Sequence, residues 1–297
     1  MKRLIPFVAF VAVLQAGPVS AQIPAGLRQA LRADTAPAST QVGLALLDLG
    51  SGDSLWIDAL WRVHAASTMK VPVLIELARR VDAGRYGWNW PVVVHNEFRS
   101  IVDSSTYHLN RADDSDSTLY AREGDTLSAR DLAWLMITRS SNLATNLMVA
   151  QLGAPAIQAT ARSLGADSIV VLRGVEDQKA FDLGLNNTTT ARDLAVLLAA
   201  IARGRAASDS STAIMLEILR HQEFRNGIPA GVPPGTRVAS KTGNLTAINH
   251  DAAIIYPPNR APYVLVILTK GFPDQPSAEQ YMAGASRLAW QGLVIGP

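Results

Sequence analysis

A serine and a lysine stand three residues apart at the start of an apolar run. Ser67 and Lys70 belong to the stretch Ala-Ala-Ser-Thr-Met-Lys, and residues 71–81 after it are mostly apolar. Residues at positions i and i+3 of a helix share one face, so the lysine amine can lie beside the serine hydroxyl. The unpaired N–H groups of a helix N-terminus also favour developing negative charge. The pair is a candidate activated nucleophile, although Ser-x-x-Lys also occurs on ordinary solvated helices.

Two later segments supply the other groups that this chemistry needs. A serine hydroxyl is a poor nucleophile without a neighbouring base, and Lys70 can serve if burial and a second cation lower its pKa. Lys241, in the sequence Ser-Lys-Thr-Gly-Asn, is a candidate for that cation. Ser140 can both donate and accept a proton, and Asn142 offers an amide that can hold the Lys70 amine and a substrate carbonyl. We expect Gly243 to allow a substrate backbone to approach an edge strand closely.

The three segments resemble the motifs of the penicillin-recognising serine hydrolases, and most closely those of the class A β-lactamases. The family motifs S-x-x-K, S-x-N and K-T-G are matched in this order by Ser67-x-x-Lys70, Ser140-x-Asn142 and Lys241-Thr242-Gly243. The resemblance runs from about residue 41 to the C-terminus. Three motifs in the family order are far more specific than the first motif alone.

The resemblance implies roles for further residues. It implies that Lys241 and Thr242 bind the carboxylate of the substrate. It also implies that the backbone N–H groups of Ser67 and Asn244 form an oxyanion hole. Asn146 matches an asparagine that the family places one helical turn beyond its S-x-N motif.

The chain departs from the family pattern where class A enzymes present the glutamate that hydrolyses the acyl-enzyme. That glutamate belongs to an omega loop with the signature R-x-E-x-x-x-N. Here Arg173 and Glu176 are one residue further apart, and asparagines follow only at positions 186 and 187. Glu176 is the best candidate for the deacylating base; the alternatives are a solvated loop acid or an ion-pair partner of Arg173 or Lys179. In the middle motif, Ser141 stands where an aspartate is more usual.

The order of the expected elements predicts an α+β fold with two lobes. The sequence predicts strands at 41–48, 54–57, 91–94, 237–242, 250–256 and 263–269. It predicts helices at 23–32, 67–83, 126–136, 142–152, 156–164, 190–203, 211–220 and 280–293. Residues 86–120, of which 113–118 are polar and turn-rich, are expected to form a solvated loop or a small hairpin insertion, and residues 173–187 a loop.

This order favours an antiparallel sheet formed by both ends of the chain, flanked by helices, with an all-helical lobe inserted. We expect a single catalytic domain over residues 22–297, with a sheet lobe at about 22–66 and 221–297 and a helical lobe at about 67–220. The 297-residue length and 48% hydrophobic residues allow a core of that size.

The first residues are typical of a secretory signal peptide. Lys2 and Arg3 precede an apolar run over residues 4–14, and small residues lead to a cleavage site after Ala21. We expect residues 1–21 to be removed and the protein to be exported, to a periplasm or out of the cell, with no stable membrane anchor. Removing Lys2 and Arg3 lowers the basic count from 27 to 25, which equals the 25 acidic residues. Without a basic stripe, nucleic acid is not an expected partner.

The chain has no cysteine, which excludes a cysteine nucleophile, a cysteine zinc site and a lipid-anchored cysteine. Its five histidines show no His-x-x-x-His spacing, so we expect neither a metal nor another cofactor. We expect a monomer.

Three functions are compatible with these patterns. The first is an exported serine hydrolase that opens β-lactam rings through an acyl-enzyme on Ser67, which water then hydrolyses. The second is a D-alanyl-D-alanine carboxypeptidase or penicillin-binding esterase that deacylates slowly after reacting with β-lactams. The third is a non-catalytic sensor of β-lactams or peptidoglycan, which normally needs a membrane span or a partner domain. The substrate is a small β-lactam or a peptide of the D-Ala-D-Ala type, and Glu176 decides between the first two functions.

Overall fold

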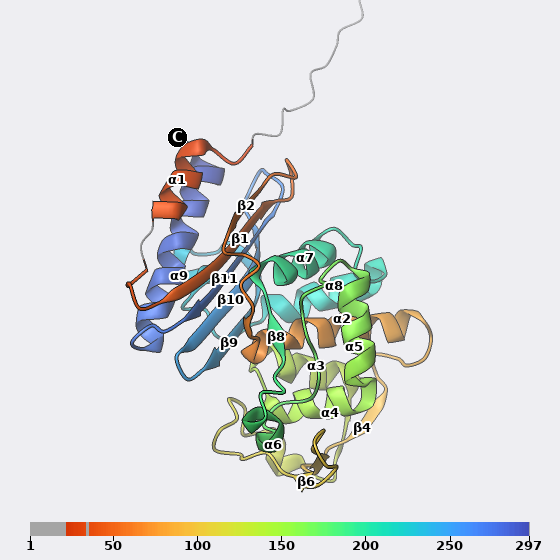
Figure 1. Ribbon diagram of the computed structural model, residues 1–297. Coiled ribbons are helices and arrows are strands. Elements are labelled where there is room, and N and C mark those ends of the chain that lie inside the picture. Colours follow the sequence, from red (N-terminus) through yellow and green to blue (C-terminus); the bar gives the residue numbers. More distant parts are fainter. Residues whose placement is uncertain (1–21, 34–35, 297) are drawn as a thin grey trace, which may run out of the picture.

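The central sheet is built from both ends of the chain, as predicted. In this computed structural model, which describes residues 22–33 and 36–296, five antiparallel strands follow the order β2-β1-β11-β10-β9 (Figure 1). The strands are β1 (Gln41–Asp48), β2 (Ser54–Ile57), β9 (Arg237–Leu245), β10 (Ile248–Tyr256) and β11 (Tyr263–Lys270). The predicted signal peptide lies outside the described residues.

One face of the sheet is covered by the two ends of the described chain. Helices α1 (Ala25–Ala33) and α9 (Gln275–Trp290) lie side by side on this face (Figure 1). A 3₁₀ turn, η3 (Ile228–Gly231), and a π-helical turn, η4 (Gln291–Ile295), pack against α9. Apolar side chains of these elements and of the sheet form the smaller of two cores.

The larger core lies on the opposite face, among the helices of the middle of the chain. These helices are α2 (Lys70–Asp82), α3 (Ala129–Thr138), α4 (Asn142–Leu152), α5 (Ala154–Ser163), α7 (Ala191–Ala202) and α8 (Asp209–Arg220). α2 is buried along its length from Lys70 to Ala78, and a helix that is mostly apolar all round belongs in such a place. This arrangement confirms the predicted α+β fold. Among the described residues, we find no helix with both the length and the apolar character needed to cross a bilayer.

The remaining elements are short. Paired two- and three-residue strands are β3 (Val63–His64) with β8 (Thr188–Thr189), β4 (Pro91–Val93) with β7 (Thr126–Ser128), and β5 (Phe98–Arg99) with β6 (Thr106–Tyr107). The remaining short helices are η1 (Ala66–Met69), η2 (Leu119–Arg122) and α6 (Gln178–Asp182). In Figure 1, α6 and β6 lie at the end of the molecule farthest from α1.

Alternation along β9 decides which of its side chains face the helices. Ala239 packs into the larger core, whereas Val238 packs into the smaller core. Because successive side chains of a strand point to opposite faces, Lys241 and Gly243 share the face of Ala239. β9 is the edge strand of the sheet, so its outer backbone groups are available to a ligand.

The starts of α3 and α9 differ from those predicted, because capping residues set them. Thr126, predicted to open a helix, belongs instead to strand β7, which pairs with β4. α3 begins only after Ser128, whose Oγ accepts a hydrogen bond of 3.1 Å from the Asp131 N–H. α9 starts five residues before its predicted position, since Asp274 caps it by accepting from the Ser277 N–H at 2.8 Å.

The solvated loop predicted at residues 113–118 is wrong for two of its aspartates. Asp114 is 8% exposed and Asp116 is 3% exposed. Both carboxylates accept backbone hydrogen bonds, which is how a buried acid is tolerated. The hairpin of this region, β5 with β6, lies earlier in the chain.

The contact between η3 and α9 allows a direct test of the smaller core. A Cβ atom at Gly231 would overlap the Ala283 carbonyl oxygen of α9, whose backbone cannot move freely. We expect Gly231→Ala to lower the free energy of unfolding by about 1–3 kcal/mol in denaturant titrations. The matched control is Gly284→Ala, where nothing lies within 4 Å of the added Cβ and helix propensity favours alanine by about 1 kcal/mol. Equal effects of the two substitutions would contradict this packing.

Candidate active site

Ser67 lies in a tight turn that ends where the buried helix α2 begins. Ala66 before it has a φ of +45°, which an alanine rarely adopts and which costs free energy. His64 supports the turn, because its Nδ1 accepts a hydrogen bond of 3.0 Å from the Ala66 N–H. Ser67 itself is half-buried and faces a cavity of about 340 Å³.

The edge strand β9 passes directly beside this turn. A Cβ atom at Gly243 would stand 3.0 Å from the backbone nitrogens of both Ser67 and Thr68. Glycine is therefore needed here for the close approach of the strand to the turn, whereas the sequence pointed to the approach of a substrate. The next residue, Asn244, lines the same cavity as Ser67.

Lys70 is fully buried and holds its amine against neutral acceptors. Its Nζ donates to the Ser140 carbonyl at 2.6 Å, to Ser140 Oγ at 3.2 Å and to Asn142 Oδ1 at 3.0 Å. Burial lowers the pKa of Lys70 to about 7, against the opposing negative charges of Asp114 and Glu176. Near neutral pH, a large share of this amine is therefore unprotonated.

Lys241 reaches the same serine from the sheet. Its Nζ donates to Ser140 Oγ at 3.0 Å and to the Thr242 carbonyl at 2.9 Å. Burial and the nearby charge of Lys70 hold the pKa of Lys241 well below its usual value, while the buried Asp251 opposes the shift. Ser140, with a left-handed φ of +60°, thus joins the two lysines through one hydroxyl.

Asn142 links Lys70 to Glu176. Its Nδ2 donates to Glu176 Oε1 at 2.7 Å, while Oε2 of the same glutamate accepts from the Asn110 N–H at 3.2 Å. Burial raises the pKa of Glu176, and these hydrogen bonds oppose the rise. Glu176 has a φ of +61°, and this unusual backbone turns its carboxylate into the cavity that Ser67 lines.

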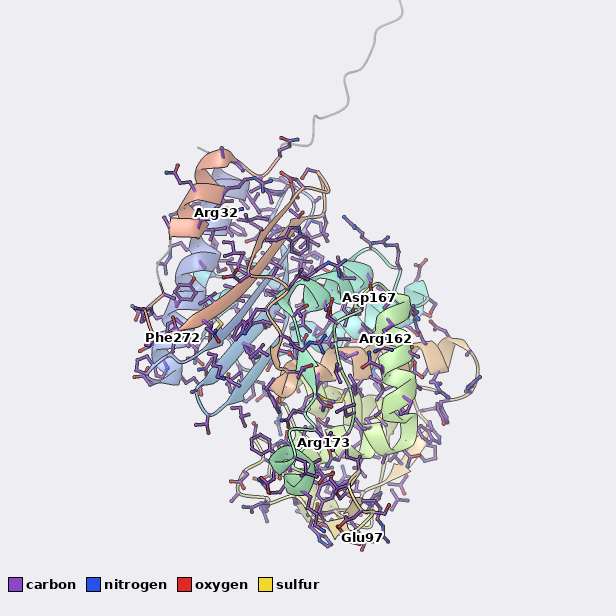
Figure 2. The ribbon with its side chains drawn as sticks, viewed as in Figure 1. Arg32, Glu97, Arg162, Asp167, Arg173 and Phe272 are labelled. Atoms are coloured by element: carbon purple, nitrogen blue, oxygen red, sulfur yellow. The ribbon has the colours of Figure 1, made fainter. Side chains whose placement is uncertain are left out.

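The omega loop (residues 173–187) is held to α4 through amides rather than ion pairs. Asn146 Oδ1 accepts from the Val175 N–H at 2.6 Å, and its Nδ2 donates to the Val175 carbonyl at 3.0 Å. Arg173, labelled beside α6 in Figure 2, donates to Asn186 Oδ1 at 3.0 Å. Lys179 pairs with Asp103 at 2.7 Å on the surface. The alternative of Glu176 as an ion-pair partner of Arg173 or Lys179 is therefore wrong.

Asp177 anchors the other side of this loop, and the sequence analysis missed it. Its carboxylate accepts from Ser100 Oγ and from the Ile101 N–H, both at 2.9 Å, and from the Ala180 N–H at 3.2 Å. It thereby caps α6 and ties the loop to the β5–β6 hairpin. Aspartate is a preferred N-cap residue, so its position directly before the short helix α6 is the local signal that could have identified it.

The predicted site residues come together in two layers. Those that line the cavity are Ser67, Asn142, Glu176 and Asn244, together with apolar side chains of Phe181 and Leu245. Lys70, Ser140 and Lys241 lie behind them, fully or almost fully buried. Thr242 is half-buried and is not among the residues that line this cavity. The described residues contain no cluster of histidine, aspartate and glutamate side chains suited to a metal ion.

A family model described as "Beta-lactamase enzyme family" matches residues 26–293. The chain belongs to this family. A β-lactamase of Amycolatopsis lactamdurans is 28% identical over 85% of this chain and 80% of its own length. A β-lactamase of Bacillus amyloliquefaciens is 30% identical over a stretch that spans only 56% of either chain. These matches confirm the family predicted from the three motifs, a class A β-lactamase-like serine hydrolase.

Solved β-lactamase-like structures share the fold. The β-lactamase of Sphaerobacter thermophilus DSM 20745 superposes with a TM-score of 0.78 and 29% identity, over 93% of this chain and 99% of that one. A mutant of PBP-A, in an acyl-enzyme complex with penicillin G, superposes with a TM-score of 0.75 and 28% identity, over 90% and 96%.

The burial of Lys70 makes a prediction about its charge. We expect the ¹³Cε resonance of Lys70 to titrate with a midpoint of about 7, since burial disfavours the ammonium form that predominates below that pH. The measurement is a ¹³C NMR titration of protein labelled at lysine, and Lys70→Met identifies the resonance by its absence. A midpoint close to the ordinary value of 10.5 would show that the amine is solvated.

Proposed function

We propose that this protein is a serine hydrolase that opens β-lactam rings through an acyl-enzyme on Ser67 and releases the product by hydrolysis. The observation that carries the proposal is the pair of buried lysines, Lys70 and Lys241, that share Ser140 Oγ, with Lys70 three residues after Ser67. A free amine beside a serine at neutral pH is what a nucleophilic serine requires. Few structural roles would explain two lysine amines buried around one hydroxyl with no carboxylate in contact, because burying an ionisable amine in this way is costly.

The proposed acylation uses these groups in turn. Ser67 Oγ attacks the lactam carbonyl, and its proton passes to the neutral Lys70 amine. The N–H groups of Ser67 and Asn244 stabilise the oxyanion, and each such donor is worth about 2.7–4 kcal/mol. When the C–N bond breaks, Ser140 passes a proton from Lys70 to the leaving nitrogen. The ring is opened, the acyl group is bonded to Ser67, and Lys70 is neutral again.

Lys241 gives the site its preference for an acidic substrate. Burial and the nearby Lys70 lower the pKa of the Lys241 amine, and an incoming carboxylate would favour its ammonium form by pairing with it. Thr242, from the same K-T-G motif, is proposed as a second partner of that carboxylate. Phe181, with 45% of its surface exposed at the rim of the cavity, offers an apolar contact to the acyl side chain.

Deacylation rests on Glu176. Its carboxylate accepts from Asn142 Nδ2, so it stands two hydrogen bonds from Lys70 and beside the cavity where the acyl group would lie. In the proposed step, Glu176 takes a proton from water, and the water oxygen attacks the ester carbonyl. The ester bond breaks, the proton held by Glu176 passes to the released Ser67 oxygen, and the product leaves as a carboxylic acid, so Ser67 and Glu176 both return to their starting states. This contact supports Glu176 as the base in spite of its irregular spacing from Arg173.

A penicillin-binding peptidase remains the second candidate. The similarity to PBP-A, whose mutant forms an acyl-enzyme complex with penicillin G, favours it. In that case acylation would proceed and the acyl-enzyme would persist. Export through the predicted signal peptide suits either activity and is part of the proposal, as is the monomeric state.

The first test is covalent. On mixing with penicillin G, we expect the intact mass of the wild-type protein to rise by the whole mass of the antibiotic, because ring opening loses no atoms. Ser67→Ala should show no adduct, and Thr68→Ser, one residue away, should keep it. Hydrolysis of a chromogenic cephalosporin that persists in Ser67→Ala would overturn the assignment of the nucleophile.

The second test concerns the base. In Glu176→Gln we expect acylation at close to the wild-type rate and deacylation slowed by about 10²–10⁴-fold, the usual value of a general base. Mass-resolved time courses separate the two steps. Glu217→Gln, which removes an exposed ion pair with Arg130, is the matched control and should deacylate normally. Equal deacylation of wild type and Glu176→Gln would exclude Glu176, and a long-lived wild-type adduct would favour the peptidase.

A further inference from the structure

Asn142 is the first residue of α4, and the unpaired N–H groups of this first turn need acceptors. Helices leave their first four N–H groups without partners inside the helix. Ser141 satisfies one of them, since its Oγ accepts from the Ala144 N–H at 3.3 Å. In the resemblance to class A enzymes, this position more usually holds an aspartate. The chain thus lacks a carboxylate of its own at the start of this helix.

A carboxylate from a different segment fills that place. Both oxygens of Asp114 lie 2.9 Å from the Asn142 nitrogen, and Oδ2 also accepts from the Leu143 N–H at 2.9 Å. Tyr120 donates its hydroxyl to Oδ2 at 3.0 Å, and the Asp116 N–H donates to Oδ1 at 3.0 Å. A carboxylate that accepts several N–H bonds at a helix N-terminus is among the stronger local interactions in proteins.

We propose that Asp114 is a positioning residue for catalysis. From another segment of the same chain, it supplies the carboxylate that position 141 lacks, and it fixes Asn142 against Lys70 and Glu176. This inference rests on the proposed function of the site. The path is short, because the backbone nitrogen of Asn142 is bound by Asp114 while its amide contacts both Lys70 and Glu176. A shift of that backbone moves both contacts together.

The charge of Asp114 also acts on the two titrating groups. It favours the ammonium form of Lys70 and so opposes the lowering of the pKa of that amine. It disfavours the carboxylate of Glu176 and so adds to the raised pKa of that acid, as does Asp113. The other ionisable groups that act on the Lys70 amine are Glu176, which also favours its ammonium form, and Lys241, which disfavours it. Loss of the Asp114 charge should therefore lower the pKa of both Lys70 and Glu176.

The segment that carries Asp114 is built to hold this carboxylate. Asp114 is 8% exposed, and its neighbour Asp116 is more deeply buried, where it accepts from Thr118 Oγ1 at 2.5 Å. Tyr120 belongs to the 3₁₀ turn η2, which packs against α4. A solvated acidic loop would need neither the buried partners nor the tyrosine.

The test compares three variants. Asp114→Asn keeps the shape and removes the charge, and we expect acylation of Ser67 by penicillin G to slow by roughly a hundredfold, as a displacement of about 1 Å can cause. We also expect the acid limb of its pH–rate profile to move to lower pH. Asp114→Glu keeps the charge but lengthens the side chain, so its rate should fall while the acid limb stays. Asp125→Asn, an exposed partner of Arg122, is the charge-matched control and should behave as wild type.

Two outcomes overturn the proposal. The first is that Asp114→Asn and Asp114→Glu acylate within twofold of wild type while only their melting temperatures fall. The second is that the ¹³Cε titration of Lys70 is the same in Asp114→Asn as in wild type. If Asp114→Asn does not fold, the Asp114→Glu rate decides in the same way. The titration of Lys70 needs no substrate, so it tests Asp114 even if wild type fails to react with penicillin and the proposed function is wrong.

Discussion

Two buried amines around one hydroxyl are the constraint on which this site depends. The direct acceptors of Lys70 are the carbonyl and hydroxyl of Ser140 and the amide of Asn142, all of them neutral. The low-dielectric surroundings then lower the pKa of the amine, because these neutral acceptors replace its hydration only in part and no carboxylate is in contact with it. Keeping water away from these amines requires α2 to be packed on every side and β9 to lie close against the Ser67 turn. The fold and the chemistry therefore share one requirement.

α4 coordinates the parts that surround these amines. Asn142 and Asn146 lie four residues apart, on one face of the helix, and each uses its amide on the omega loop. Asn142 orients the Glu176 carboxylate, and Asn146 holds the backbone of Val175 beside it. The loop is thus positioned by a rigid helix at two neighbouring points. Asp177 fastens its far side to the β5–β6 hairpin, so the position of Glu176 depends little on the length of the loop.

The sequence predicted those parts of the site whose geometry follows from a single element. Ser67 and Lys70 lie one turn apart, and Lys241 and Gly243 share one face of a strand, so periodicity suffices for both pairs. Periodicity could not place Glu176. The contact of Glu176 with Asn142 depends on the left-handed backbone at Glu176 and on the hydrogen bond from the Val175 N–H to Asn146. The starts of α3 and α9 were missed, where Ser128 and Asp274 cap the helix, whereas the start of α4 after Ser141 was predicted correctly. The role of Asp114 had no local signal, since the N–H groups of α4 that it binds lie 28 and 29 residues away along the chain.

Three residues at or beside the proposed chemistry, Ala66, Ser140 and Glu176, have left-handed backbones although none is glycine. Each stores conformational free energy that the surrounding packing must offset. Stability and activity therefore make opposite demands at these positions. Glycine would relieve the backbone strain, but it would remove or loosen the side chains that the proposed chemistry needs in place. The free energy of unfolding contributed by distant packing, such as that of α9 on the far face of the sheet, then sets how many destabilising substitutions the active site can tolerate. In this protein, the active site can therefore accept new substitutions only as far as packing elsewhere keeps the fold stable.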